Sequence, residues 1–172
     1  MRAKAAWLAL LCLALLLAAG PAQAEVKVRV LCINDGDTIT VMLKGRPERV
    51  RLIGVDAPEM VHSQGLARRA RRHGRTAKQV TALGAASRGA VLSVLAPDDE
   101  VRLVWGPQRR DDHRRLLAYV YLADGRLLNR WLIEEGWARA YHRFEHKYKQ
   151  EFLRLENEAR RARRGLWAQG GP

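Results

Sequence analysis

The sequence has few cysteines, few acidic residues and no apolar run long enough for an ordinary membrane span. Only two of its 172 residues are cysteine, and Cys12 lies inside the main apolar run, Ala5–Ala19. A framework of several disulfides is therefore excluded. The run is shorter than the roughly 20 residues of a spanning helix. The 18 acidic residues face 31 lysines and arginines, a formal net charge of +13, which favours polyanionic partners.

The N-terminus has the three parts of a secretory signal. Arg2 and Lys4 precede the apolar run, and Ala22-Gln23-Ala24 is a small-x-small cleavage site. We therefore expect residues 1–24 to be removed and the protein to reach the periplasm or the medium without stable membrane association. A membrane anchor is the alternative, and the short run disfavours it.

The remaining chain, residues 25–172, has a size that suits one domain, which we expect to be monomeric. Cys32 is then its only cysteine, so no intramolecular disulfide can form. Because Cys32 stands between Leu31 and Ile33 in an apolar alternating run, we predict a buried, inert thiol.

Alternating apolar residues predict three consecutive strands in the first half. Residues 26–30 and 38–43 alternate with period two, and a turn at 44–47 leads into a third strand at Arg49. Short consecutive strands joined by tight turns favour a meander, the first half of an oligonucleotide/oligosaccharide-binding (OB) barrel.

The second half adds helices and two more strands. Helical spacing favours helices over 76–95, from Leu127 to near Gly136, and over 148–162, while 101–105 and 116–122 read as strands. We expect Asn129 to fix the local fold through polar contacts. The predicted class is α+β, a five-stranded OB-fold barrel with about three helices.

Two acidic stretches flank the third strand. Residues 34–38 read Asn-Asp-Gly-Asp-Thr, and residues 51–59 read Arg-Leu-Ile-Gly-Val-Asp-Ala-Pro-Glu. If the strands pair, Asp37 can reach Asp56, and together they would supply the charged oxygen ligands that Ca²⁺ prefers. Strict alternation places Asp56 on the face opposite Arg51, so a common site requires a bend or bulge near Gly54.

A third stretch, residues 111–119, reads Asp-Asp-His-Arg-Arg-Leu-Leu-Ala-Tyr. Together the three stretches resemble the staphylococcal nuclease family, whose pattern is Asp-Gly-Asp-Thr, then Arg-Leu-x-x-Val-Asp-x-Pro-Glu, then Asp-x-Tyr-Gly-Arg-x-Leu-Ala-Tyr. The resemblance covers roughly residues 26–167, and three ordered motifs are stronger evidence than one short match.

The resemblance implies an exported, calcium-dependent phosphodiesterase that acts on DNA and RNA and leaves 3′-phosphate ends. It implies that Asp37, Asp56 and the carbonyl of Ala57 bind Ca²⁺, that Glu59 positions or deprotonates the attacking water, and that Arg51 and Arg115 bind the phosphate. Two positions depart from the pattern: His113 replaces the tyrosine and Arg114 replaces the glycine. We predict that His113 contacts the substrate. Arg114 lacks the conformational freedom of glycine, so an altered turn is an open alternative at this position.

Two alternative interpretations fit parts of the sequence. A non-catalytic OB-fold module that only binds nucleic acid would be expected to lack some of the implied catalytic residues, and all five charged ones are present. The segment His142–His146 matches the His-x-x-Glu-His pattern of some zinc peptidases, which requires a long helix and a third ligand. We expect a polar loop or helix entry there instead.

Overall fold

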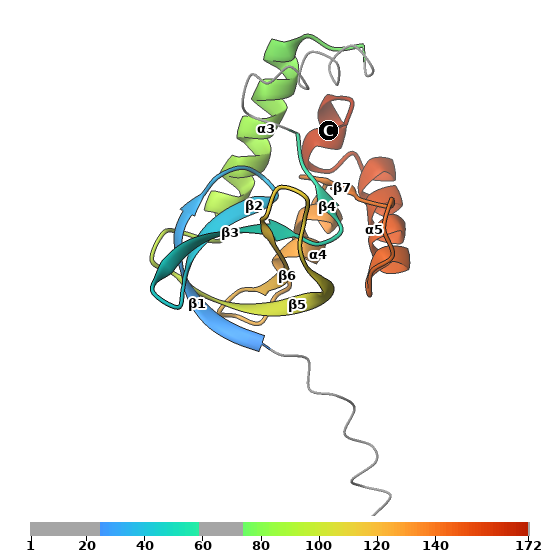
Figure 1. Cartoon of the computed structure of the whole chain (residues 1–172). Helices are drawn as coiled ribbons and strands as arrows, with labels where there is room; N and C mark the ends of the chain where they lie inside the picture. The colour runs from blue at the N-terminus through green and yellow to red at the C-terminus, as the bar shows by residue number, and fades with distance from the viewer. Residues whose placement is uncertain (1–24, 59–73, 172) are drawn as a thin grey trace, which may run out of the picture.

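The computed structural model describes residues 25–58 and 74–171 (Figure 1). The predicted signal, residues 1–24, lies outside the described residues, and so does Glu59. None of the helices in the described ranges has the length and apolar character needed to cross a membrane.

Five strands close into a barrel in the order β1-β2-β3-β6-β5. They are β1 (Glu25–Ile33), β2 (Thr38–Leu43), β3 (Arg46–Leu52), β5 (Glu100–Arg110) and β6 (Leu116–Tyr121). All neighbours are antiparallel except β3 and β6, which are parallel. The predicted five-stranded barrel is confirmed.

The barrel interior is apolar because each strand turns alternate side chains inward. Val30, Val41, Val50, Leu103 and Val120 are fully buried there. Burial of such side chains away from water is the main favourable term that holds the strands together.

Two sequence predictions about the strands were wrong. Cys32 is exposed because a bulge between Val30 and Cys32 shifts the alternation and leaves Ile33 as the buried residue. The third strand begins at Arg46, not Arg49, because the tight turn consists of Lys44 and Gly45 alone, both with positive φ.

Three α-helices cover the barrel within the described residues. They are α3 (Ala77–Leu92), α4 (Leu128–Glu134) and α5 (Lys149–Arg161), and a short 3₁₀ helix, η1 (Gly165–Gln169), follows. Thr76 and Gln79 form a reciprocal capping box at the start of α3. In Figure 1, α3 (green) stands at the side of β1 and β2, while α4 and α5 (orange) lie together.

Asn129 joins α4 to the barrel. Its Oδ1 accepts from the Val120 amide at 2.9 Å, and its Nδ2 donates to the carbonyls of Ile53 at 2.9 Å and Ala118 at 3.3 Å. The side chain is fully buried, so these bonds replace water for three backbone groups. The predicted structural role of Asn129 is confirmed.

Candidate active site

The chain bends immediately after β3. Ile53 and Gly54 form a turn, Gly54 has φ +76°, and the two-residue strand β4 (Val55–Asp56) then pairs with β7 (Arg139–Ala140). A Cβ on Gly54 would lie 2.5 Å from the ring of His146, so both conformation and space require glycine. The bend predicted near Gly54 is confirmed.

Because of this bend, Arg51 and Asp56 share one site. The Nη2 of Arg51 donates to the Val55 carbonyl at 2.8 Å and lies 3.7 Å from Oδ1 of Asp56. Its Nη1 forms an ion pair with Oδ1 of Asp37. The Arg51 side chain is 17% exposed, so its charge lies near the surface but is largely enclosed by these groups.

Asp37 connects the start of β2 to the segment after β4. Its Oδ2 accepts from the amide of Ala57 at 2.8 Å, and its Oδ1 accepts from the hydroxyl of Thr38 at 3.0 Å. Thr38 itself pairs with Arg51 in the β2–β3 register. The strand pairing expected from the sequence therefore brings Asp37 to the segment that carries Asp56.

Asp35 shapes the turn that presents Asp37. Its Oδ1 accepts from the Asp37 amide at 3.0 Å. Burial raises the pKa of Asp35, although the nearby charges of Arg51 and Arg115 and hydrogen bonds from Thr38 act to lower it. Since both guanidiniums act on this one carboxyl group, Arg115 belongs to the same charged cluster as Arg51.

Helix α3 packs directly against the acidic turn. A Cβ on Gly36 would lie 1.9 Å from Oγ of Ser87 and 2.8 Å from Cβ of Ala57. Arg88 donates from Nε to the carbonyl of Ile33 at 2.8 Å. The turn is therefore fixed from behind by a helix, and Gly36 is required by close approach.

Arg115 is held by a residue that the sequence analysis did not assign, Asp111. The Nε and Nη2 of Arg115 lie 2.8 and 2.7 Å from Oδ2, and the Arg115 amide donates to Oδ1 at 2.9 Å. Burial acts to raise the pKa of Asp111, but the hydrogen bonds and charge of Arg115 outweigh it and lower the pKa. The available signal was the four-residue spacing from Asp111 to Arg115 across a turn.

The two positions that depart from the family pattern lie on the turn between β5 and β6. The His113 side chain is exposed, and its amide donates to Oδ1 of Asp111 at 3.0 Å. Arg114 has φ +64°, the left-handed conformation that glycine adopts most easily. The carbonyl of Arg114 accepts from Nη1 of Arg110 at 2.7 Å. Arg114 thus adopts a glycine-like conformation in spite of its side chain.

Replacing Arg114 with glycine is expected to stabilise the protein by roughly 1 kcal/mol, because a left-handed non-glycine residue is strained by about that amount or more. Urea unfolding of the two proteins measures the difference. Arg143→Gly, at an exposed position without positive φ, serves as the control and should lose stability slightly. Equal or lower stability of Arg114→Gly would show that the turn carries no such strain.

The structure brings most of the predicted site residues together. Arg51, Asp37, Asp56 and the amide of Ala57 meet at the ends of β2, β3 and β4, with Arg115 nearby. Three or more Asp, Glu, His or Cys side chains do not converge as a metal cluster anywhere in the described residues. The third predicted carboxylate, Glu59, lies outside them.

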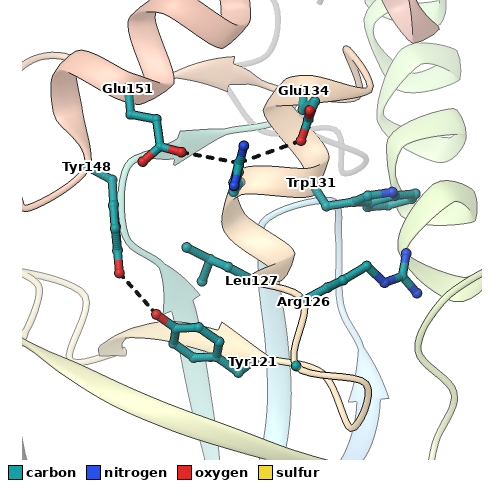
Figure 2. Close-up of a pocket in the computed structure, with 9 residues that line it drawn as sticks. Tyr121, Arg126, Leu127, Trp131, Glu134, Tyr148 and Glu151 are labelled. Atoms are coloured by element: carbon teal, nitrogen blue, oxygen red, sulfur yellow. Dashed lines mark hydrogen bonds and ion pairs between the residues drawn. The ribbon is translucent and has the colours of Figure 1, made fainter.

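A separate pocket of about 420 Å³ lies between β6, α4 and α5 (Figure 2). Of the predicted site residues that the structure describes, none lines it. Arg130 lies 3.2 Å from Glu151 and 3.6 Å from Glu134, and the hydroxyls of Tyr121 and Tyr148 are 3.0 Å apart. The charged side chains of Arg130, Glu134 and Glu151 in this pocket are thus paired with one another. The pair of Arg130 and Glu151 joins α4 to α5.

The segment His142–His146 is not helical, since α5 begins only at Lys149. The expected polar loop is confirmed. His146 packs against Phe152 and Gly54, and its Nδ1 lies 3.5 Å from the Tyr119 hydroxyl. Burial and the charge of Lys149 lower the pKa of His146, which therefore favours the neutral form behind the bend.

Comparison with known proteins gives consistent matches. The family described as "Staphylococcal nuclease homologue" matches residues 49–169. A "Thermonuclease" of Staphylococcus hyicus is 30% identical over 145 residues, which cover 84% of this chain and 77% of that protein. "Protein ParB" of Escherichia coli is 35% identical over 164 residues (91% and 80%), and an "Uncharacterized endonuclease" of Escherichia coli O157:H7 is 29% identical over 149 residues (87% and 82%).

Proposed function

Because the chain belongs to the staphylococcal nuclease family, we propose that it is a calcium-dependent nuclease that hydrolyses phosphodiester bonds in DNA and RNA. Relatives named as thermonucleases and endonucleases support a hydrolase that acts on nucleic acids. The observation that carries the proposal is the meeting of Arg51 with Asp37 and Asp56 at one end of the barrel.

The two carboxylates fit a hard metal ion. A single guanidinium, that of Arg51, lies near both Asp37 and Asp56, so one cation can be shared between them. Carboxylate and carbonyl oxygens are the ligands that Ca²⁺ prefers, and we assign Asp37, Asp56 and the carbonyl of Ala57 to it. When bound, Ca²⁺ would neutralise charge on the scissile phosphate and favour attack by water.

The two arginines are proposed to bind the phosphate. A guanidinium can give paired N–H donors to phosphoryl oxygens, and these bonds strengthen as negative charge grows in the transition state. The Asp111 carboxylate accepts from two guanidinium nitrogens of Arg115 and holds it in place, while Arg51 donates to the Val55 carbonyl. These contacts hold both arginines near the proposed metal ligands before any substrate binds.

Glu59 is proposed to position or deprotonate the attacking water. The water oxygen bonds to phosphorus while the P–O5′ bond breaks, the 5′-oxygen takes up a proton, and a 3′-phosphate end remains. His113, exposed on the adjacent turn, is proposed to contact the substrate. We further propose that residues 1–24 direct export and that residues 25–172 act as one monomeric domain in the periplasm or the medium.

A module that binds nucleic acid without cleaving it is the competing function. The test is cleavage of single-stranded DNA, duplex DNA and RNA by the purified protein with Ca²⁺ and with a chelator. The proposal expects degradation that requires the metal. Binding without cleavage under any divalent ion would favour the module instead.

Glu59→Gln is expected to lower kcat by about 100-fold or more, because a positioned general base contributes at least that factor. Binding of Ca²⁺ and of a nucleotide should persist, since the amide keeps the shape and the other proposed ligands remain. Titration with Ca²⁺ and single-turnover cleavage measure the two properties. Turnover equal to that of the unchanged protein would refute the role of Glu59.

A further inference from the structure

An arginine outside the assigned set lies beside Asp56. Arg139 on β7 is the direct partner of Asp56 in the β4–β7 ladder. Directly opposed residues of an antiparallel pair project from the same face. Burial lowers the pKa of Arg139, while the charges of Glu156 and Asp56 act to raise it and those of Arg75 and Arg160 act to lower it. Arg139 therefore lies among two carboxylates and two other guanidiniums.

The Nε of the Arg139 guanidinium is buried and has no hydrogen-bond partner within the described part of the chain. Glu156 accepts from the amide of Ala140 at 3.2 Å. A partly buried donor without an acceptor is costly, so its presence calls for an explanation.

Arg139 shares an aromatic platform with Arg160. The guanidinium carbons of Arg139 and Arg160 lie 5.8 and 5.0 Å from the centre of the Trp167 ring. The indole Nε1 of Trp167 is likewise buried without an acceptor. Figure 1 shows β7 and β4 close to the C-terminal turn that carries Trp167, which also contacts α5. The cluster thus combines two guanidiniums, that of the exposed Arg160 and that of the half-buried Arg139, on one indole ring.

We propose that Arg139, together with Arg160 and Trp167, binds a backbone phosphate of the nucleic acid next to the scissile phosphate. This inference rests on the proposed function, which assigns Asp56 to the metal beside the scissile phosphate. A guanidinium stacked on an indole keeps its N–H edge for phosphate oxygens. A flanking phosphate would accept from the outer N–H groups of the two guanidiniums, and contacts of this kind fix the register of the chain without reading its bases.

The test compares substrates that differ by one phosphate. The minimal substrate is a dinucleotide with a single phosphodiester bond, and two longer ones add a terminal phosphate at the 5′ or the 3′ end. The measured quantity is the ratio of kcat/KM for each longer substrate to that for the minimal one. Arg139→Met, which keeps the apolar stem, should lower one of the two ratios by about tenfold, the value of a lost hydrogen bond to a charged group.

Two further variants make the result specific. Arg139→Lys should recover part of the lost ratio, because it keeps the charge without the planar fork. Arg154→Met, on the same helix as Arg160 and paired with Glu158, should leave both ratios unchanged. A loss that is equal for all three substrates, or no loss at all, would overturn the subsite.

Failure of the proposed function would be recognised separately, as absence of cleavage by the unchanged protein. In that case, binding of a labelled single-stranded oligonucleotide is measured at several salt concentrations. Arg139→Met should reduce the slope of log affinity against log salt by about 0.7, the value for one lost phosphate contact on a single strand. An unchanged slope would exclude the phosphate contact whether or not the protein is a nuclease.

Discussion

Replacing Arg51 with lysine is expected to lower kcat by about 1000-fold or more while the protein remains folded. Arginines that stabilise the charge of a phosphoryl-transfer transition state contribute factors of that size. Lysine retains the charge and can still pair with Asp37, but it cannot present two parallel donors to a phosphate. It also cannot reach the Val55 carbonyl and both carboxylates at once, as Arg51 does.

Cleavage rates at saturating substrate measure this effect, with unfolding curves to confirm that the barrel persists. Arg49→Lys is the matched control, because Arg49 lies two residues earlier on the same strand and is exposed. It should retain the activity of the unchanged protein. A loss confined to KM in Arg51→Lys would mean that Arg51 binds the substrate and the transition state equally, contrary to the proposed role.

The sequence predicted the barrel well because its strands follow a simple period. Apolar residues alternate along most of β1 and β2, and a strand with one buried face has little freedom of register. The common site of Arg51 and Asp56 was also predictable, since it required a bend and Gly54 could supply one. At this site, the bend that the residue types predict is present in the fold.

Other features could not be read from periodicity. The bulge at Cys32 depends on how β1 matches β2, not on the residues of β1 alone. The pairing of Arg139 with Asp56 joins positions far apart in the chain through two-residue strands, which are too short to show a period. Asp111 holds Arg115 only because the turn between them closes. Such contacts come from tertiary packing.

Replacing Asn129 with alanine is expected to destabilise the protein by about 2 kcal/mol or more. The substitution leaves the Ile53 carbonyl and the Val120 amide without a partner, and each unsatisfied group costs about 1–3 kcal/mol. The Ala118 carbonyl still accepts from the Ile53 amide at 3.0 Å. That is a large part of the usual stability of a small domain, about 5–15 kcal/mol. Urea unfolding measures it, and Asn157→Ala on the exposed face of α5 is the control, expected within about 0.5 kcal/mol.

The same substitution should also affect catalysis, because the Ile53 carbonyl that Asn129 holds belongs to the turn between Arg51 and Asp56. At a temperature where Asn129→Ala is fully folded, kcat should still be reduced, since the bend would lose one of its anchors to α4. Asn129→Asp should not restore stability, because it keeps the acceptor for Val120 but buries a charge and removes both donors. If Asn129→Ala cost less than about 1 kcal/mol, water would have to replace the amide in the core, and the bend would owe its geometry to Gly54 and the β4–β7 pairing alone.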